Sequence, residues 1–306
     1  MKLSIVTTMY CSEPYLMDFY RRISESADFI TKSYEIIFVN DGSPDSSLKT
    51  ALDLQKKDKK IKIIDLSRNF GHHKALITGL SHARGDYVFL IDSDLEEEPE
   101  LLPVFWKRMK ETGDIDVIYG RQKKRKGGLI ERATGWLFYR LFNLFSENKI
   151  PENLVVARLM KKKYVKDLIL HREYHPVLAG LFELTGYTQE AFVIEKKNKG
   201  KTTYNLRRKL NMIVNSITSF SAKPLVYIFY LGLLISSVTF IFIIRILYQK
   251  LFLNIAVGWA SIVVSVWFFG GLIIFCIGII GIYLSRVFEQ TKGRPYVIIK
   301  DIYGDE

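Results

Sequence analysis

The chain has 306 residues, 48% of them hydrophobic and 25% charged, which is enough for one large domain with a second part attached. Its 44 Lys and Arg residues outnumber its 32 Asp and Glu residues, giving a formal net charge of +12. Between residues 224 and 285 the charged side chains are only Arg245 and Lys250. Because this part is so apolar, the basic remainder favours an anionic membrane surface, and not a nucleic acid, as the partner.

The two cysteines lie in segments of opposite character. Cys11 is in the first predicted loop, whereas Cys276 is in an apolar run. We therefore expect no disulfide, which fits a reducing cytosol. The apolar stretch at residues 1–6 is too short for a signal peptide and reads as a first strand.

Strands alternate with helices over the first part of the chain. Strands are predicted at 3–9, 34–39, 61–66, 87–92 and 116–119, and helices at 13–26, after 45, at 72–83 and at 99–112. This alternation predicts an α/β fold with a mostly parallel sheet and right-handed crossovers. The first strand is not followed by Gly-x-Gly-x-x-Gly, which disfavours a dinucleotide-binding dehydrogenase.

Asp92 and Asp94 follow the apolar strand that begins at Tyr87. Alternate residues of an extended chain share a face, so the two carboxylates should converge while Ser93 points away. Paired carboxylates suit Mg²⁺ or Mn²⁺ when the ion also holds phosphates. The alternative is a solvated acidic loop. A position after a buried strand favours the metal site, because ligands of open α/β sheets gather at the carboxyl ends of strands.

Two other polar loops follow predicted strands. Asp41 follows the second strand, and Arg68 with Asn69 follows the third, so these residues should meet Asp92 and Asp94 at one edge. For Asp41 a simple turn and helix cap is the competing interpretation. The histidine pair 72–73 is open to two interpretations, metal ligands or an exposed helix start.

The character of the chain changes after residue 120. Residues 121–128 form a basic loop, and 129–145 mix aromatic residues with arginine, which is typical of a helix in a membrane interface. A second such helix is predicted at 206–220. Core helices packed on a sheet are the alternative for both. Between these two helices we expect a helix to about residue 170 and a strand near 191–195.

The apolar run 224–244 is long enough to span a hydrocarbon core of about 30 Å. A second span fits within 257–284, separated from the first by Tyr248-Gln249-Lys250. A buried hairpin of a soluble protein would not tolerate this length without polar groups. Basic residues are more numerous on the domain side, so both termini should be cytoplasmic. Glycines between 270 and 281 would let helices pack closely, within the hairpin or between the subunits of a homo-oligomer. A short strand is expected at 296–302.

Several motifs together carry a resemblance that covers essentially the whole chain. They are Val39-Asn40-Asp41-Gly42-Ser43, Arg68-Asn69-Phe70-Gly71, Ala83-Arg84-Gly85-Asp86-Tyr87, Asp92-Ser93-Asp94-Leu95 with Pro99-Glu100, Tyr119-Gly120-Arg121, Arg158-Leu159-Met160, Gly200-Lys201-Thr202-Thr203-Tyr204 and Ser219-Phe220-Ser221 before Pro224-Leu225. With them the chain resembles the polyprenyl-phosphate glycosyltransferases of glycosyltransferase family 2, the group of dolichol-phosphate mannose synthase and bacterial undecaprenyl-phosphate glycosyltransferases.

The resemblance implies a cytoplasmic GT-A (Rossmann-like) catalytic domain at 1–204, which includes an interfacial helix at about 129–146. It further implies a juxtamembrane helix at 205–223, transmembrane helices at about 224–248 and 257–284, and a cytoplasmic tail at 286–306. Such an enzyme sits in the inner membrane. It transfers one sugar from a UDP- or GDP-linked donor to polyprenyl phosphate, for modification of a cell-envelope glycan.

The same resemblance assigns residue roles. Metal binding, by Mg²⁺ or Mn²⁺, falls to Asp92 and Asp94. The donor would contact Thr8, Tyr10, Glu13, Asp41, Arg68, Asn69 and Asp92. The lipid phosphate would contact Arg121 and Arg132. Position along the chain adds Arg125, in the basic loop after a strand, and Arg207 and Arg208, just before the first span. The acceptor phosphate is already an anionic nucleophile, so no strong general base is required.

The chain departs from the family pattern at four places. Val155-Val156-Ala157 stands where many relatives have an Asp before Arg-Leu-Met, and Thr8 replaces the usual Pro. Glu96-Glu97-Glu98 replaces the commoner Gln-Asp-Pro, and Ala179-Gly180 lacks a preceding Arg. Two other functions compete: a processive polysaccharide synthase, which would need a Gln-x-x-Arg-Trp motif and more helices, and a non-catalytic membrane scaffold, which would not need aspartates at one edge.

Overall fold

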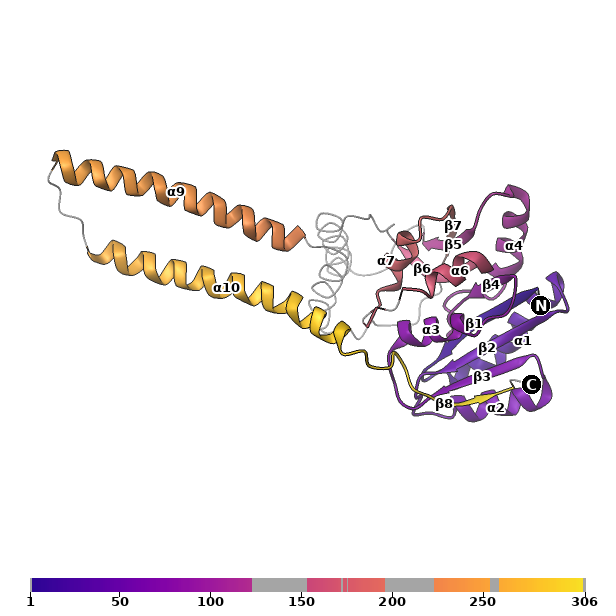
Figure 1. Cartoon of the computed structure of the whole chain (residues 1–306). Coiled ribbons are helices and arrows are strands. Elements are labelled where there is room, and N and C mark those ends of the chain that lie inside the picture. The colour runs from indigo at the N-terminus through magenta and orange to yellow at the C-terminus, as the bar shows by residue number, and fades with distance from the viewer. Residues whose placement is uncertain are drawn as a thin grey trace. The chain divides into compact units, whose positions relative to one another are not determined.

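The computed structural model describes residues 2–122, 153–171, 173–174, 176–195, 223–253 and 259–304 (Figure 1). These residues fall into two compact units. One unit holds the sheet with its helices and includes the segment after residue 293, and the other holds two long helices. The predicted basic loop beyond Gln122 and both predicted interfacial helices lie outside the described residues. The same is true of four predicted site residues, Arg125, Arg132, Arg207 and Arg208.

The first unit is built on an eight-stranded sheet of order β7-β5-β6-β4-β1-β2-β3-β8. Its strands are β1 (Leu3–Met9), β2 (Tyr34–Asn40), β3 (Ile61–Leu66), β4 (Tyr87–Leu90), β5 (Val117–Gln122), β6 (Leu154–Lys161), β7 (Gln189–Ile194) and β8 (Ile299–Tyr303). The central strands β4, β1, β2 and β3 are parallel, as predicted from the alternation of strands and helices. The sheet as a whole is mixed, because β6 runs antiparallel to β4 and β5, and β8 runs antiparallel to β3.

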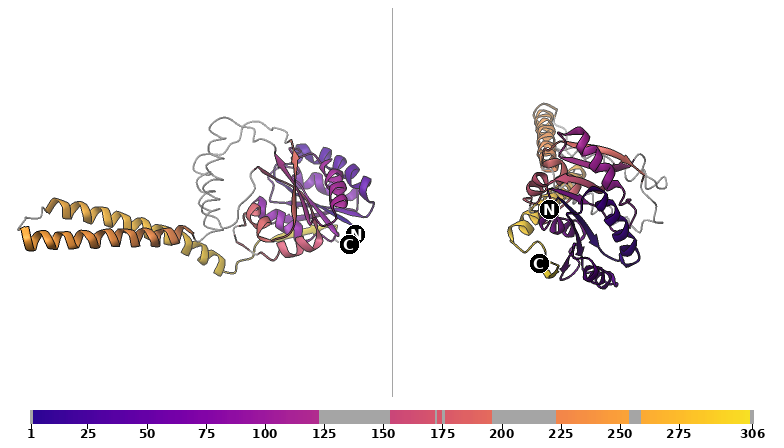
Figure 2. Two further views of the ribbon diagram at one scale, coloured as in Figure 1. Left: turned by 90° about the horizontal axis from the view of Figure 1, so that it is seen from above. Right: turned by 90° about the vertical axis from the view of Figure 1, so that its right-hand side faces the viewer.

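Helices cover both faces of this sheet (Figure 2). They are α1 (Glu13–Ile30), α2 (Ser47–Lys57), α3 (His72–Ser81), α4 (Leu101–Thr112), α6 (Lys162–Leu168) and α7 (Leu178–Leu184). Apolar side chains of α1, α2 and α4 form one core with alternate strand residues such as Ile5 and Phe38. Neighbouring strand residues face the opposite side, where α3 and α6 pack.

Helix α3 lies directly on β1 and β2 because Gly79 has no side chain. A Cβ at this position would be 2.4 Å from Val6 Cγ1 and 2.9 Å from Val39 Cγ2. No larger residue would allow the helix to come so close to the strands. This packing places the first residue of α3, His72, at the edge where β1 and β2 end.

The second unit contains α9 (Lys223–Leu253) and α10 (Trp259–Thr291). Within them, Lys223–Phe242 and Ser265–Thr291 have mean hydropathies of 2.2 and 2.4, long and apolar enough to cross a membrane. Helix α9 continues beyond the predicted first span, 224–244. Tyr248-Gln249-Lys250, expected to separate the spans, lies inside α9. Lys and Gln are good helix formers, so one charged residue in this segment does not end the helix.

After α10 the chain supplies the edge strand of the sheet. Strand β8 pairs antiparallel with β3, with Ile64 opposite Ile302. The backbone N–H of Ser67 also donates to the carbonyl of Ile298 over 2.9 Å. The strand expected at 296–302 is therefore present, shifted toward the C-terminus.

Candidate active site

The loops that follow β1, β2, β3 and β4 share one edge of the sheet. In the parallel ladders Met9 is opposite Asn40, Asn40 is opposite Asp65, and Val6 is opposite Leu90. The strands therefore end at nearly the same level. The structure brings together the loops that carry Asp41, Arg68 and Asp92, as the order of the elements predicted, and Thr8 lies near the end of β1 at the same edge.

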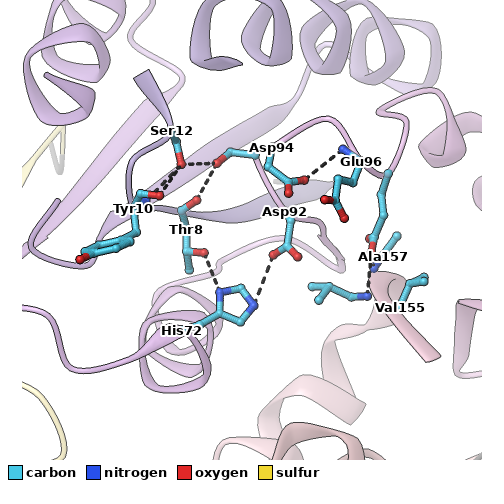
Figure 3. A network of polar contacts seen from close by, with 12 residues as sticks. Thr8, Tyr10, Ser12, His72, Asp92, Asp94, Glu96, Val155 and Ala157 are labelled. Atoms are coloured by element: carbon cyan, nitrogen blue, oxygen red, sulfur yellow. Dashed lines mark hydrogen bonds and ion pairs between the residues drawn. The ribbon is translucent and has the colours of Figure 1, made fainter. Parts of the chain in front are cut away.

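His72 joins the end of β1 to the loop after β4 (Figure 3). Its Nδ1 is 3.2 Å from Thr8 Oγ1, and its Nε2 is 3.4 Å from Asp92 Oδ1. His73 makes a different contact, with Nδ1 2.9 Å from the carbonyl of Pro176. The structure thus separates two histidines whose roles the sequence left open. Only the first reaches the carboxylates.

Asp92 and Asp94 lie on a turn and not on an extended strand, because β4 ends at Leu90. The turn is fixed by Ser93, whose buried hydroxyl donates to the carbonyl of Thr8 over 2.8 Å. Asp94 Oδ1 accepts a hydrogen bond from the backbone N–H of Glu96 over 3.0 Å. The Ser93 hydroxyl also lies 3.1 Å from Ser12 Oγ.

The chemistry of this turn suits a hard divalent cation. Within the described ranges, no three His, Cys, Asp or Glu side chains form a closed metal-binding cluster. The chain offers carboxylate oxygens on one turn, a donor set that leaves other coordination positions for phosphate oxygens and water. Asp92 is partly exposed, with 22% of its side-chain surface accessible.

Asp41 braces the loop after β3. Its buried carboxylate accepts hydrogen bonds from the backbone N–H groups of Phe70, over 2.7 Å, and Gly71, over 3.1 Å. Burial raises the pKa of Asp41, and these two hydrogen bonds act in the opposite direction. Gly42 has φ +59°, and a Cβ there would be 2.5 Å from the carbonyl carbon of Arg68. The loops after β2 and β3 are thus held together by hydrogen bonds and by close backbone contact.

Arg68 and Asn69 are exposed on that braced loop. The Arg68 guanidinium lies over the Phe70 ring, 4.2 Å from its centroid, and its Nη1 donates to the carbonyl of Asn69 over 3.1 Å. The orientation of the loop is therefore fixed from inside by Asp41, while its polar groups remain accessible to a ligand.

The loop after β1 is braced by Asp45, which the sequence indicated only as a cap of the next helix. Asp45 accepts hydrogen bonds from the backbone N–H groups of Glu13, over 3.1 Å, and Ser47, over 3.0 Å, and from the hydroxyls of Ser43 and Ser47. Partial burial would raise its pKa, but these hydrogen bonds outweigh burial and lower the pKa to about 2. On the braced loop Tyr10 is 52% exposed.

Arg121 lies at the same edge as Asp92. Leu90 of β4 and Tyr119 of β5 both pair with Arg158 of the strand between them. Strands β4 and β5 run in the same direction, but the register shifts beyond Tyr119 and Arg121 pairs with Leu154. The exposed Arg121 therefore lies on the strand beyond β6 from β4, toward the end of the sheet where the acidic turn follows β4.

Sequence reasoning missed the role of two buried charged residues next to this turn. Glu97 is 1% exposed and accepts hydrogen bonds from the backbone N–H groups of Val156 and Ala157. Arg158, also 1% exposed, lies over the Phe182 ring, and burial lowers its pKa to about 10. The available signal was an acidic run, Glu96 to Glu98, which did not show which glutamate turns inward.

Comparisons with known proteins show which family the chain resembles. The chain matches the family model Glycosyl transferase family 2 over residues 4–169. A protein of Mycobacterium tuberculosis (strain CDC 1551 / Oshkosh), named among glycosyltransferases, is 49% identical over 100% of this chain and 90% of its own length. The prophage bactoprenol glucosyl transferase homolog of Escherichia coli K12 is 33% identical over 99% of both chains.

Solved structures share the fold at low sequence identity. Glucosyl-3-phosphoglycerate synthase of Mycobacterium tuberculosis, in complex with Mn²⁺, uridine diphosphate and phosphoglyceric acid, superposes with a TM-score of 0.52. The match has 18% identity and covers 71% of this chain and 78% of that one. The chain therefore has a GT-A fold and belongs to glycosyltransferase family 2.

Proposed function

We propose that this chain transfers one sugar from a UDP- or GDP-linked donor to a polyprenyl phosphate at the cytoplasmic face of a membrane. In a bacterium this acceptor would be undecaprenyl phosphate. The supporting observation is the match to the bactoprenol glucosyl transferase homolog of Escherichia coli, which spans 99% of the chain and so includes α9 and α10. The product would be a lipid-linked sugar for modification of a cell-envelope glycan.

The donor site of this proposal is the shared edge of β1 to β4. Tyr10 and Glu13 would flank the nucleotide, while Arg68 and Asn69 would contact it from the loop that Asp41 braces. Thr8 would act through its contact with His72. Support for this division comes from burial, because Tyr10 and Arg68 are exposed whereas both oxygens of Asp41 already accept backbone hydrogen bonds.

Asp92 and Asp94 would hold Mg²⁺ or Mn²⁺ together with the donor diphosphate. A divalent cation at this place supplies positive charge against the diphosphate that leaves. Neighbouring groups would orient the two aspartates: His72 contacts Asp92, and the backbone N–H of Glu96 donates to Asp94.

The acceptor site would lie on the side of β5. An oxygen of the lipid phosphate forms the new bond to the anomeric carbon of the sugar, and the bond from that carbon to the nucleoside diphosphate breaks. Since the phosphate is already anionic, no proton has to be removed by a strong base. Arg121 would bind this phosphate, since arginine can donate two parallel hydrogen bonds to a phosphate group. Arg125, Arg132, Arg207 and Arg208 remain candidates for the same group.

Helices α9 and α10 would anchor the enzyme in the inner membrane as a hairpin, with both termini in the cytosol. The lipid tail stays in the bilayer, so the reacting phosphate is confined to the interface. Their apolar composition supports this arrangement. Glycines of α10 would allow close packing with a second copy, and we include a homo-oligomer in the proposal.

The test is a transfer assay with the full-length protein in lipid nanodiscs that contain undecaprenyl phosphate. A panel of UDP- and GDP-linked sugars is supplied with Mn²⁺ or Mg²⁺, and lipid products are identified by mass spectrometry. We expect a product with one added sugar, lost on addition of chelator and in Asp92→Asn protein.

Other outcomes identify the competing functions. Lipids that carry many sugars would instead indicate a processive synthase. Absence of any product with every donor, while the protein binds no nucleotide sugar in calorimetry, would favour a non-catalytic scaffold.

A further inference from the structure

A buried carboxylate binds the backbone of β6 just beyond the point where its pairing with β4 ends. Strand β4 pairs with β6 from Tyr87, opposite Lys161, to Leu90, opposite Arg158. Leu90 is the last residue of β4. Strand β6 begins four residues before Arg158, at Leu154. At this uncovered part, Glu97 Oε1 accepts from the N–H of Val156 over 3.1 Å and Oε2 accepts from the N–H of Ala157 over 2.6 Å. The side chain thus replaces a strand partner for two backbone amides, of which that of Ala157 is buried.

The carbonyl groups of the same segment are bound from another direction. Arg158 Nε donates to the carbonyl of Val156 over 3.3 Å. Both Glu97 and Arg158 are 1% exposed, and the negative charge of Glu97 favours the charged guanidinium. A glutamate from one loop and an arginine of the strand together fix the backbone at Val156. This is an expensive arrangement unless both charges are present, because a buried charge that loses its partner is strongly destabilising.

The loop between β4 and Glu97 is held at two points. At one end Ser93, 2% exposed, donates to the carbonyl of Thr8. At the other end Glu97 holds β6. Between them Leu95 has φ +60°, which is unfavourable for a residue with a branched side chain, and it packs against the core. Such a conformation persists only where the surroundings determine it. Asp94 lies within this stretch.

We propose that Glu97 is a positioning residue that ties the acidic turn to β6 and thereby sets the geometry of Asp92 and Asp94. The inference rests on the proposed function, in which those two aspartates hold a divalent cation. It also answers a question raised by the sequence. Residues 155–157 carry no acidic side chain of their own, and the structure supplies a carboxylate to this part of the strand from the acidic run after Asp94.

The test compares Glu97→Gln and Glu97→Asp with the parent protein, each as the full-length chain in nanodiscs. Gln keeps the shape but presents an N–H₂ group to one of the two N–H donors, whereas Asp keeps the charge on a shorter arm. Glu98→Gln, from the same acidic run, is the matched control. Mn²⁺ affinity is measured in the presence of UDP by electron paramagnetic resonance. Amide hydrogen exchange at residues 155–157 is measured without metal.

We expect Glu97→Gln to weaken Mn²⁺ affinity about tenfold or more, the range seen when groups that orient metal ligands are removed. Exchange at Val156 and Ala157 should accelerate in the same variant. Glu97→Asp should recover part of the affinity, and Glu98→Gln should match the parent in both readouts. A purely structural role would lower the unfolding temperature and leave the Mn²⁺ affinity of the folded protein unchanged.

Parental Mn²⁺ affinity in folded Glu97→Gln protein would overturn the inference. If that variant does not fold, Glu97→Asp decides: accelerated exchange at Val156 and Ala157 together with parental Mn²⁺ affinity would overturn the inference, because the contact with β6 would be weakened without any effect on the metal site. Failure of the proposed function would give a different result. The parent would then bind Mn²⁺ in the presence of UDP but transfer no sugar, and the Mn²⁺ affinities of the Glu97 variants could still be compared with that of the parent. Transfer by the parent in excess chelator would overturn the metal assignment and this inference together.

Discussion

Thr8 and Asp92 contact the same imidazole. His72 places one ring nitrogen 3.2 Å from Thr8 Oγ1 and the other 3.4 Å from Asp92 Oδ1. The ends of β1 and β4 are thus connected through the first residue of α3, whose position depends on close packing at Gly79. A side chain in a helix on one face of the sheet therefore limits the rotamers of a carboxylate in the acidic turn.

Replacing His72 with Ala should lower kcat about tenfold while the protein stays folded, because Asp92 loses the group that orients it. His72→Asn should retain more activity than His72→Ala, since an amide can still contact one of the two oxygens. Steady-state kinetics and the unfolding temperature provide the measurement. His82→Ala, at the other end of α3, serves as control, and equal kcat in His72→Ala and parent would contradict the prediction.

Asp92→Asn and Asp94→Asn should each abolish transfer. The amide removes one negative charge from the proposed cation site, which weakens the ion that neutralises the leaving diphosphate. Membrane insertion and the unfolding temperature should be close to those of the parent. The measurement is product formation across a range of Mn²⁺ concentrations. Full activity in both variants would remove these aspartates from the site.

Arg121→Ala should raise the KM for the lipid phosphate or lower kcat, with little change in the affinity for nucleotide sugar. Arg121 lies on β5, which β6 separates from β4, on the proposed acceptor side. Arg121→Lys should restore only part of the effect, because Lys lacks the two-pronged contact. Kinetics with varied lipid and calorimetry with varied donor separate the two sites. The control is Arg21→Ala, at an exposed position of α1. Weaker donor binding alone would assign Arg121 to the nucleotide site.

Asp45 should contribute stability that depends on pH. Its pKa is about 2 in the folded protein, below the ordinary value of 3.8. A lowered folded pKa gives stability that is present above the unfolded value and is lost as the pH falls toward 2. Asp45→Asn should therefore destabilise the sheet unit by about 1–2 kcal/mol at pH 7 and by less at pH 3. Chemical unfolding at both pH values tests this, with exposed Asp53→Asn as control. A difference that stays constant with pH would contradict it.

Reporter tags placed at Met1 and after Glu306 should be found on the same, cytoplasmic side of the membrane. The prediction follows from two apolar helices and from basic residues that are more numerous before α9 and after α10 than in the sequence between the two spans. Protease accessibility in sealed inverted vesicles is the measurement. Tags on opposite sides would mean that only one helix spans.

The sequence predicted best those features of the fold that depend only on the order of strands and helices. Alternating strands and helices predicted the parallel centre of the sheet, and strand order then placed the loops with Asp41, Arg68 and Asp92 at one edge. Strand β6 was missed. Its middle contains Arg158, and a charged residue within an apolar run argues against a buried strand unless its partners are known. Those partners include backbone carbonyls and a ring that sequence spacing does not reveal.

The acidic run shows the same limit at the level of single residues. Glu96, Glu97 and Glu98 are chemically identical, so composition could not tell which one turns inward. That choice depends on the backbone at Leu95, whose positive φ redirects the chain. The contact of Glu97 is with main-chain amides and leaves no trace in the residue types of β6.

The position of β8 affects the order in which the protein can fold during synthesis. The strand at the β3 edge belongs to residues made after both long apolar helices. Until those helices have left the ribosome, β3 keeps a row of unpaired backbone groups, which is a template for pairing with another chain. The catalytic sheet is therefore completed only after the two apolar helices have been synthesised. A chain ended by a stop codon between α10 and β8 would carry every proposed catalytic residue but keep a permanently open edge.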